Sequence, residues 1–197
     1  MAAIHRVRFP APLQGKVGPT SLVLRPCDPV DALTQELDRS RAWITTHHAG
    51  LIDVLERLIS AYAEQIRADQ PCLLHNDTTF DNFVVTDDAV RPIDWDLPAV
   101  GYPLAELANL DQQAYLYGSA DGLPAEFWHG YGRTYPPGLL LIYRAMRCIS
   151  LLASPCWATW EADPAVSEAT KAELRRRHEL HKKWTTTLPT LLQHADP

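Results

Sequence analysis

The stretch that decides the fold reads Leu73-Leu74-His75-Asn76-Asp77-Thr78-Thr79-Phe80-Asp81-Asn82-Phe83-Val84-Val85, and Arg91-Pro92-Ile93-Asp94-Trp95-Asp96 follows it closely. Asn82 stands five residues and Asp94 seventeen residues after Asp77. An apolar run at 72–74 predicts a short buried strand that leads into the polar loop 75–82. Two further apolar runs flank the turn-forming pair Asp87-Asp88 and predict a hairpin. That hairpin would bring Asp94 back towards Asp77 and Asn82.

Three polar side chains in this arrangement suit phosphoryl transfer. Asp77 can accept a hydrogen bond from a hydroxyl and align it on a terminal phosphate, while Asn82 and Asp94 can hold magnesium on the phosphate oxygens. The spacing H-x-D-x-x-x-x-N is also that of the kinase catalytic loop. An isolated loop aspartate more often caps its own backbone. The matching positions of Asn82 and Asp94 favour the catalytic interpretation of Asp77.

The neighbours of these three residues add further predictions. Ile93 and Trp95 are large and apolar, so we expect them to be buried and the Asp94 carboxylate between them to need a partner such as a metal ion. Asp96 is either a further carboxylate at the metal or a surface residue. His75 is expected to hold the loop by hydrogen bonds to backbone groups near Asp94. A catalytic role for His75, as a general base in place of the loop aspartate, is the alternative.

The composition describes an ordinary globular chain. Its 197 residues predict one domain or one large lobe, and 46% hydrophobic residues supply a sizeable core. The formal net charge of −6 argues against nucleic acid as the main partner and against an anionic membrane surface. The most apolar segment, 139–153, carries two arginines and is too short to span a bilayer. No apolar run at the N-terminus predicts a signal peptide.

The cysteines indicate the compartment. They are widely spaced and form no C-x-x-C pair, which argues against a zinc site and against a disulfide framework. We therefore expect free thiols in a reducing cytoplasm. The four residues are Cys27, Cys72, Cys148 and Cys156.

Hydrophobic periodicity predicts an α+β chain that is predominantly helical. The clearest helix runs over 51–68, where apolar residues recur at helical spacing. The last predicted helix, 165–187, has Asp163 as its N-cap, and its His178 and His181 are expected on a solvated basic face. Further helices are predicted over 31–45, 104–117, 123–131 and 138–153, and strands over 4–9 and 21–25 with a loop between them.

The segment 73–107 resembles the aminoglycoside phosphotransferase and choline kinase-like family, the small-molecule relatives of protein kinases. In that family the loop usually reads H-G-D-x-x-x-x-N and the metal motif reads I-D-W-[DE]. Here Asn76 replaces the glycine, and Ile93-Asp94-Trp95-Asp96 supplies the second motif. Gly101-Tyr102-Pro103-Leu104-Ala105-Glu106-Leu107-Ala108 resembles the family's G-x-P-x-x-D-L-A, with Glu106 at the acidic position.

The resemblance implies a kinase-like C-lobe that uses ATP as phosphate donor and magnesium as cofactor, with a small hairpin beside its catalytic loop. It assigns Asp77 as the base, and Asn82 and Asp94 as the ligands of magnesium on the bound nucleotide. The acceptor would be a hydroxyl of an aminoglycoside, another antibiotic, an amino alcohol or a sugar. The acidic residues considered as contacts for a cationic acceptor are Asp96, Glu106 and Asp111.

The N-terminal part departs from the family pattern. Relatives place a small lobe with a nucleotide-covering loop and a strand lysine before the catalytic loop, but only 74 residues precede His75. Lys16 stands in a proline-rich segment expected to be a loop, which matches a strand lysine poorly. We therefore expect residues 1–27 to be residual small-lobe strands and a hinge-like segment. Residues 28–197 would form the C-lobe around the catalytic loop 73–96.

Three hypotheses for the function follow. The first is a phosphotransferase that transfers the γ-phosphate of ATP to a small-molecule hydroxyl, with weak or absent turnover in this short form or with a partner chain completing it. The second is a pseudokinase-like module that binds a nucleotide or small molecule without turnover. The third is the remnant of a truncated gene. An exposed apolar patch where the small lobe docks would favour a homodimer or a partner chain.

Overall fold

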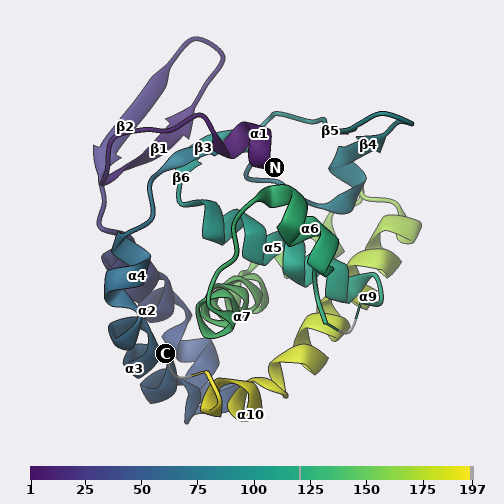
Figure 1. The fold of residues 1–197 in the computed structure, drawn as a ribbon. Helices are drawn as coiled ribbons and strands as arrows, with labels where there is room; N and C mark the ends of the chain where they lie inside the picture. Colours follow the sequence, from purple (N-terminus) through teal and green to yellow (C-terminus); the bar gives the residue numbers. More distant parts are fainter. Residues whose placement is uncertain (120, 196–197) are drawn as a thin grey trace.

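Helix α7, Pro137–Ala153, forms the centre of the helical body in the computed structural model, which describes residues 1–119 and 121–195 (Figure 1). Buried side chains recur along its whole length because it is enclosed by other helices. This confirms that the apolar segment 139–153 is a core helix. The helices packed around it are α2 (Pro29–His48), α3 (Leu51–Ala61), α5 (Pro103–Leu116), α9 (Glu168–Thr185) and α10 (Leu188–Gln193).

The remaining helices are short. With the strands they complete an α+β fold in which helices predominate, as the sequence predicts. No single helix within the described residues is long and apolar enough to cross a membrane, although α7 and α8 pass that test together as a bent pair. The short helices are α1 (Ala2–His5), α4 (Ala63–Arg67), α6 (Ala125–Tyr131) and α8 (Cys156–Ala162).

Two predicted helices have different ends in the structure. The helix expected over 51–68 divides at Tyr62, whose buried hydroxyl donates to the carbonyl of Ala195 at 3.0 Å. The last long helix starts at Glu168 rather than 165 because Ser167, not Asp163, is its N-cap: the Ser167 hydroxyl accepts from the Thr170 amide at 3.1 Å. Asp163 instead accepts from the amide of Ala165 in the preceding turn.

A four-stranded antiparallel sheet runs in the order β2-β1-β6-β3. The strand predicted over 4–9 is wrong, since this segment forms α1 and a single bridge between Arg8 and Cys72. The loop predicted between the two N-terminal strands contains β1, and Lys16 therefore lies on a strand. The strands are β1 (Leu13–Val17), β2 (Leu22–Pro26), β3 (Cys72–Leu74) and β6 (Ala99–Gly101), while β4 (Phe83–Val85) and β5 (Val90–Pro92) form the predicted hairpin.

The N-terminal ribbon belongs to the same sheet as the strands around the catalytic loop. In β1, Gly15 pairs with Val100 of β6 and with Leu24 of β2. A Cβ on Gly15 would collide with the carbonyl of Val23, so the close approach of the two ribbon strands requires glycine here. The sheet therefore spans the domain boundary expected at residue 27. It joins the N-terminal strands β1 and β2 to β3, which leads into the catalytic loop.

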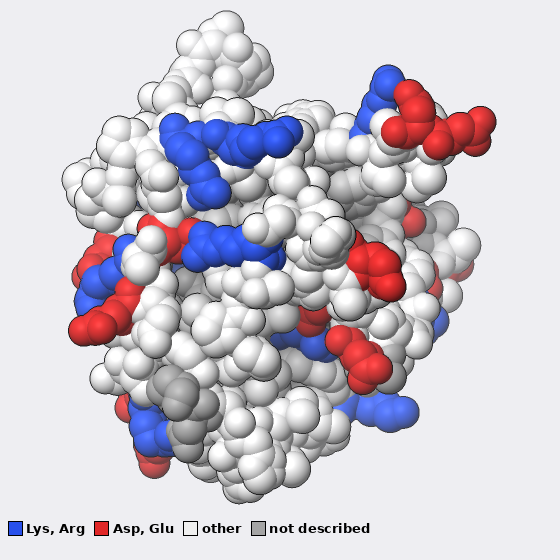
Figure 2. Space-filling model, in the orientation of Figure 1, with Lys and Arg blue, Asp and Glu red and all other residues white. Residues whose placement is uncertain are grey.

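The surface carries charges of both signs. Figure 2 shows them scattered over the face seen in Figure 1, with acidic and basic groups together at the tip of the β4–β5 hairpin, where Asp87 and Asp88 are exposed. All four cysteines are free, as expected, and two of them, Cys72 and Cys148, are buried.

A buried polar cluster joins α5, α7 and α9. His181 lies inside it, with its Nδ1 3.2 Å from the sulfur of Cys148 and 3.3 Å from the side-chain amide of Gln112. The expected solvated position of His181 is therefore wrong, because α9 packs against α7 and this residue contacts Cys148 there. Burial, the largest effect, lowers the pKa of His181 to about 4.

Replacing Gly138 by alanine is expected to destabilise the fold. A Cβ at this position would meet the carbonyl of Ala195 and the hydroxyl of Tyr62, pushing apart the contact that closes the C-terminal segment. We expect the free energy of unfolding, measured in urea, to fall by about 2 kcal/mol. The matched change Gly130→Ala, in α6 with open space around it, should be neutral or stabilising by up to about 1 kcal/mol. Equal effects of both changes would contradict this packing.

The low pKa of His181 predicts a pH-dependent stability. The unfolded chain takes up a proton near the ordinary histidine pKa of 6.5, whereas the folded protein takes it up only near 4. The free energy of unfolding therefore decreases as pH falls from about 7 towards 4, by about 2 kcal/mol at pH 5 from this group. In His181→Gln, urea unfolding at pH 7 and pH 5 should show a correspondingly smaller loss, whereas His129→Gln on the exposed face of α6 should behave like the natural protein. A loss in His181→Gln as large as in the natural protein would show that this group is not responsible.

Candidate active site

A buried histidine fixes the start of the catalytic loop. His75 follows β3 directly and is fully buried, and its Nε2–H donates to the carbonyl of Ile93 at 2.7 Å. The edge contact between its ring and Trp95, with centroids 4.6 Å apart, adds to this attachment. The hydrogen bond to the backbone beside Asp94 confirms the expected structural contact. Complete burial favours this positioning role over that of a general base.

Two residues of the loop region adopt left-handed backbone conformations. Asn76 has φ 66° and Asp94 has φ 60°. Asparagine and aspartate tolerate this region better than other non-glycine residues. This explains how Asn76 can stand where the resemblance places glycine. The backbone N–H of Asn76 donates to Glu106 Oε1 at 2.6 Å, and this hydrogen bond holds the turn in place.

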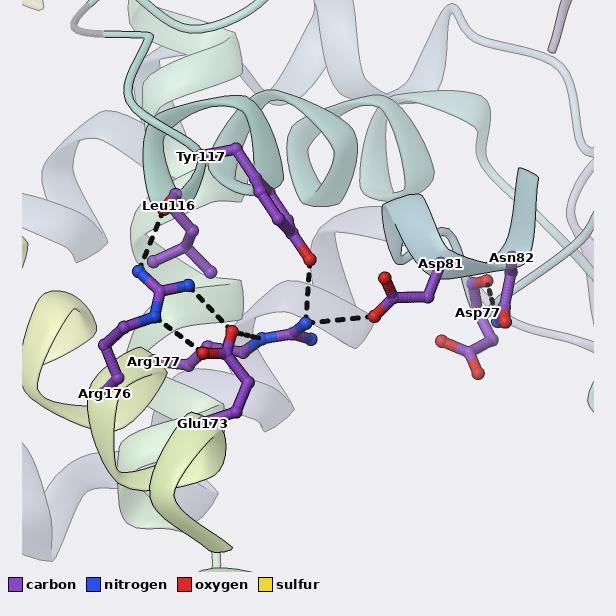
Figure 3. A network of polar contacts seen from close by, with 8 residues as sticks. All are labelled: Asp77, Asp81, Asn82, Leu116, Tyr117, Glu173, Arg176 and Arg177. Atoms are coloured by element: carbon purple, nitrogen blue, oxygen red, sulfur yellow. Dashed lines mark hydrogen bonds and ion pairs between the residues drawn. The ribbon is translucent and has the colours of Figure 1, made fainter. Parts of the chain in front are cut away.

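Asp77 and Asn82 lie together on the loop (Figure 3). A short 3₁₀ turn, Phe80–Asn82, returns the chain so that Asn82 Nδ2 donates to the backbone carbonyl of Asp77 at 3.0 Å. This hydrogen bond orients the amide and leaves its Oδ1 available. Within the described part of the chain, the Asp77 carboxylate has no hydrogen bond or ion pair to protein. It is therefore available to a ligand.

The hairpin brings Asp94 to the same end of the molecule, but at an exposed position. Ile93 and Trp95 are 44% and 39% exposed, so the expectation that they bury Asp94 is wrong. The reason is that these residues follow the β4–β5 hairpin, which projects from the body (Figure 1). Asp96 is exposed as well. The carboxylates of Asp94 and Asp96 make no hydrogen bond or ion pair to protein within residues 1–119 and 121–195.

The donor set fits magnesium carried by a phosphate better than a preformed metal site. Among the described residues, no three His, Cys, Asp or Glu side chains are grouped so as to hold a metal ion. Magnesium prefers oxygen ligands and is commonly bound by one or two protein groups together with phosphate oxygens. The Asn82 amide oxygen and the Asp94 carboxylate are donors of this kind.

An arginine from α9 clamps the loop from the side (Figure 3). Arg177 Nη2 donates to Asp81 at 3.0 Å and to the Tyr117 hydroxyl at 2.8 Å, while its Nε donates to Glu173 at 2.8 Å. Phe80 stacks on Tyr117, with ring centroids 5.2 Å apart. The 3₁₀ turn that presents Asn82 is therefore fastened to α5 and α9. The sequence pattern did not reveal this contact, since 96 residues separate Arg177 from Asp81.

Two of the acidic residues considered as contacts for a cationic acceptor already form hydrogen bonds within the protein. Both oxygens of buried Glu106 are used, one by Asn76 and the other by His5, whose Nε2 donates at 2.7 Å. Buried Asp111 accepts from Arg144 at 2.6 Å and from the Leu123 amide at 2.7 Å. Glu106 and Asp111 are thus structural, and the prediction for them is wrong. Asp96 stays a prediction.

A cavity of about 550 Å³ lies beside the catalytic loop. It is open to solvent on one side and lined by the β1–β2 ribbon, β6 and helices α2, α5 and α7. Its size is that of a small-molecule site. The polar residues that line it include Lys16, Arg25, Asn76, Thr78, Asn109 and Arg147. Asn76 and Thr78 are the two neighbours of Asp77, so the cavity adjoins the candidate base.

Comparison with known proteins identifies the family. The model of the phosphotransferase enzyme family matches residues 1–141, more than half of the chain, and the protein belongs to this family. The family resemblance of the segment 73–107 is thereby confirmed, and the helices and antiparallel strands of the structure confirm the α+β fold class.

Among solved structures, the chain is similar to that of spectinomycin phosphotransferase APH(9)-Ia in complex with ADP and spectinomycin. It is 18% identical, with a TM-score of 0.42 over 83% of this chain. The chain spans about half the length of that protein, 47%. No curated protein matches the chain.

Removing the Arg177 clamp is expected to loosen the catalytic loop. In Arg177→Gln the ion pair with Asp81 is lost, so amide hydrogen exchange at residues 78–83 should become faster. The free energy of unfolding should fall by no more than about 1 kcal/mol because the pair is partly exposed. Arg176→Gln is the matched control, since Arg176 also pairs with Glu173 but does not contact the loop. Equal exchange in both variants would show that the clamp does not order the loop.

Proposed function

We propose that this chain is an ATP- and magnesium-dependent phosphotransferase that acts on a hydroxyl of a small molecule. The proposal rests on the contact that joins the loop of Asp77 and Asn82 to the β4–β5 hairpin. His75 holds Ile93, and this contact sets Asp94 beside the loop that carries Asp77 and Asn82. The carboxylates of Asp77 and Asp94 make no hydrogen bond or ion pair to protein within the described residues. Family membership supports the same reaction class.

In this proposal each residue has a distinct task. Asp77 accepts the proton of the acceptor hydroxyl and aligns its oxygen on the γ-phosphorus. The acceptor oxygen bonds to that phosphorus, the bond from phosphorus to the β–γ bridging oxygen breaks, and ADP leaves. Asn82 and Asp94 bind magnesium on the phosphates, with Asp96 as a further carboxylate beside them. When bound, magnesium offsets the negative charge of the phosphate oxygens.

A binding module without turnover is the second candidate, and the exposed hairpin favours it. Ile93, Trp95 and Leu97 are all exposed, the last by 59%, so the phosphates would lie against a surface open to water. Catalytic electrostatics are strongest where water is excluded. We therefore expect weak turnover from this chain alone.

Titration calorimetry of MgATP into the full chain tests the proposal. We expect binding that requires magnesium and that weakens by about tenfold or more in Asp94→Ala. Asp87→Ala, on the turn of the same hairpin, is the control and should bind as the natural protein does. Asp77→Asn should keep MgATP binding and lose phosphoryl transfer to any acceptor by about a hundredfold or more.

Two results would count against these assignments. No binding of MgATP to the folded chain contradicts a nucleotide site, whereas binding unaffected by Asp94→Ala contradicts only the metal ligand.

A further inference from the structure

The cavity beside the loop is lined by three cations, Lys16, Arg25 and Arg147, one each from β1, β2 and α7. Two carboxylates also reach it, but each is already engaged. Glu36 pairs with Arg39 one turn further along α2. Glu106 is held by His5 and by the Asn76 amide. The cavity therefore presents more available positive than negative charge.

Arg147 is linked by hydrogen bonds to the residue next to the candidate base. Its Nε donates to Asn109 Oδ1 at 3.2 Å, and Asn109 Nδ2 donates to the Thr78 hydroxyl at 2.8 Å. Two hydrogen bonds thus connect the guanidinium to the residue after Asp77. Within the described residues the terminal nitrogens of Arg147 make no hydrogen bond to protein. Arg147 is exposed and lines the cavity.

The electrostatics agree with this position. Arg147 is exposed, yet desolvation by the atoms packed around it lowers its pKa, while the nearby carboxylates of Asp77 and Glu36 act in the opposite direction. Arginine nevertheless stays charged at neutral pH. A partly desolvated guanidinium with free terminal N–H groups fits the two oxygens of a carboxylate or phosphate. The buried hydroxyl of Ser150, which also lines the cavity, has no partner among the described side chains.

We propose that this cavity binds the acceptor, and that the acceptor is a small hydroxyl compound carrying a carboxylate or phosphate group held by Arg147. When the acidic group of the acceptor binds Arg147, the acceptor hydroxyl can lie near Asp77, because Thr78 is hydrogen-bonded towards Arg147 and is next to Asp77 in sequence. The assignment of the acceptor rests on the proposed function, because Asp77 is taken as the base. A polycationic acceptor would instead meet Lys16, Arg25 and Arg147.

Three six-carbon polyols that differ in charge provide the test: gluconate, sorbitol and glucosamine. Titration calorimetry on the full chain should show gluconate binding about tenfold or more tightly than the other two. In Arg147→Gln the affinity for gluconate should fall to that for sorbitol. Arg147→Lys should be intermediate, since it keeps the charge and loses the planar fork. Arg175→Gln, on the exposed side of α9, is the matched control and should change nothing. Circular dichroism confirms that each variant is folded.

Several results would overturn the proposal. They are glucosamine binding at least as tightly as gluconate, gluconate binding unaffected by Arg147→Gln, and no binding of gluconate or glucose 6-phosphate at millimolar concentrations. These titrations need neither ATP nor magnesium. Failure of the phosphotransferase proposal would therefore not obscure their outcome.

A last titration separates the acceptor from the donor as the source of the anion. Gluconate is titrated into protein with and without saturating MgADP. Unchanged gluconate binding supports an acceptor site. Competition would show that the phosphates of the donor occupy the cavity, and would overturn the assignment to the acceptor.

Discussion

The candidate site depends on one hydrogen bond made by a fully buried imidazole. The Nε2–H of His75 donates to the carbonyl of Ile93 at 2.7 Å and so joins the end of β3 to the end of the hairpin. Asp77 and Asn82 lie on one side of this bond and Asp94 on the other. A buried imidazole N–H without an acceptor would be costly, so the bond also decides where the hairpin rests. Glu106 completes the attachment by holding the Asn76 amide, which lets the chain turn through a left-handed residue just before Asp77.

Local patterns in the sequence predict much of this arrangement. The periodicity of α2, α3, α5 and α7, the turn between β4 and β5, and the contact of His75 near Asp94 depend on residues close in sequence, and all are found in the structure. The prediction of a strand over 4–9 is wrong because pairing in the N-terminal segment also depends on residues far away in sequence. Strand β1 pairs with β2 nearby, but also with β6, where Gly15 faces Val100, 85 residues away, and a propensity argument has no access to that second partner.

The same limit applies to charged residues on helices. From the sequence alone, Arg177 and His181 are both predicted to be exposed to solvent. Their helix contains many arginines and lysines, which indicate a basic surface face. In the structure Arg177 reaches the catalytic loop and His181 enters the core between α5 and α7. Glu106 and Asp111 show the converse error, because acidic residues after the loop read as substrate contacts until their partners are known. In each instance the partner of the residue lies on another helix, strand or loop, whose position in space cannot be predicted from the sequence pattern.

Net charge and local charge therefore carry different information about the ligand. The chain is acidic overall, at −6, yet the cavity beside the loop is lined by Lys16, Arg25 and Arg147. The acidic excess is a sum over the whole surface, where many carboxylates form ion pairs such as Glu161 with Arg175. The field inside a cavity is set by the few groups that line it and lack partners. The motif around Asp77 is common to the reaction class, whereas the cations come from β1, β2 and α7, outside that motif. For this reason the chemistry of the acceptor follows from the cavity wall and not from the family resemblance.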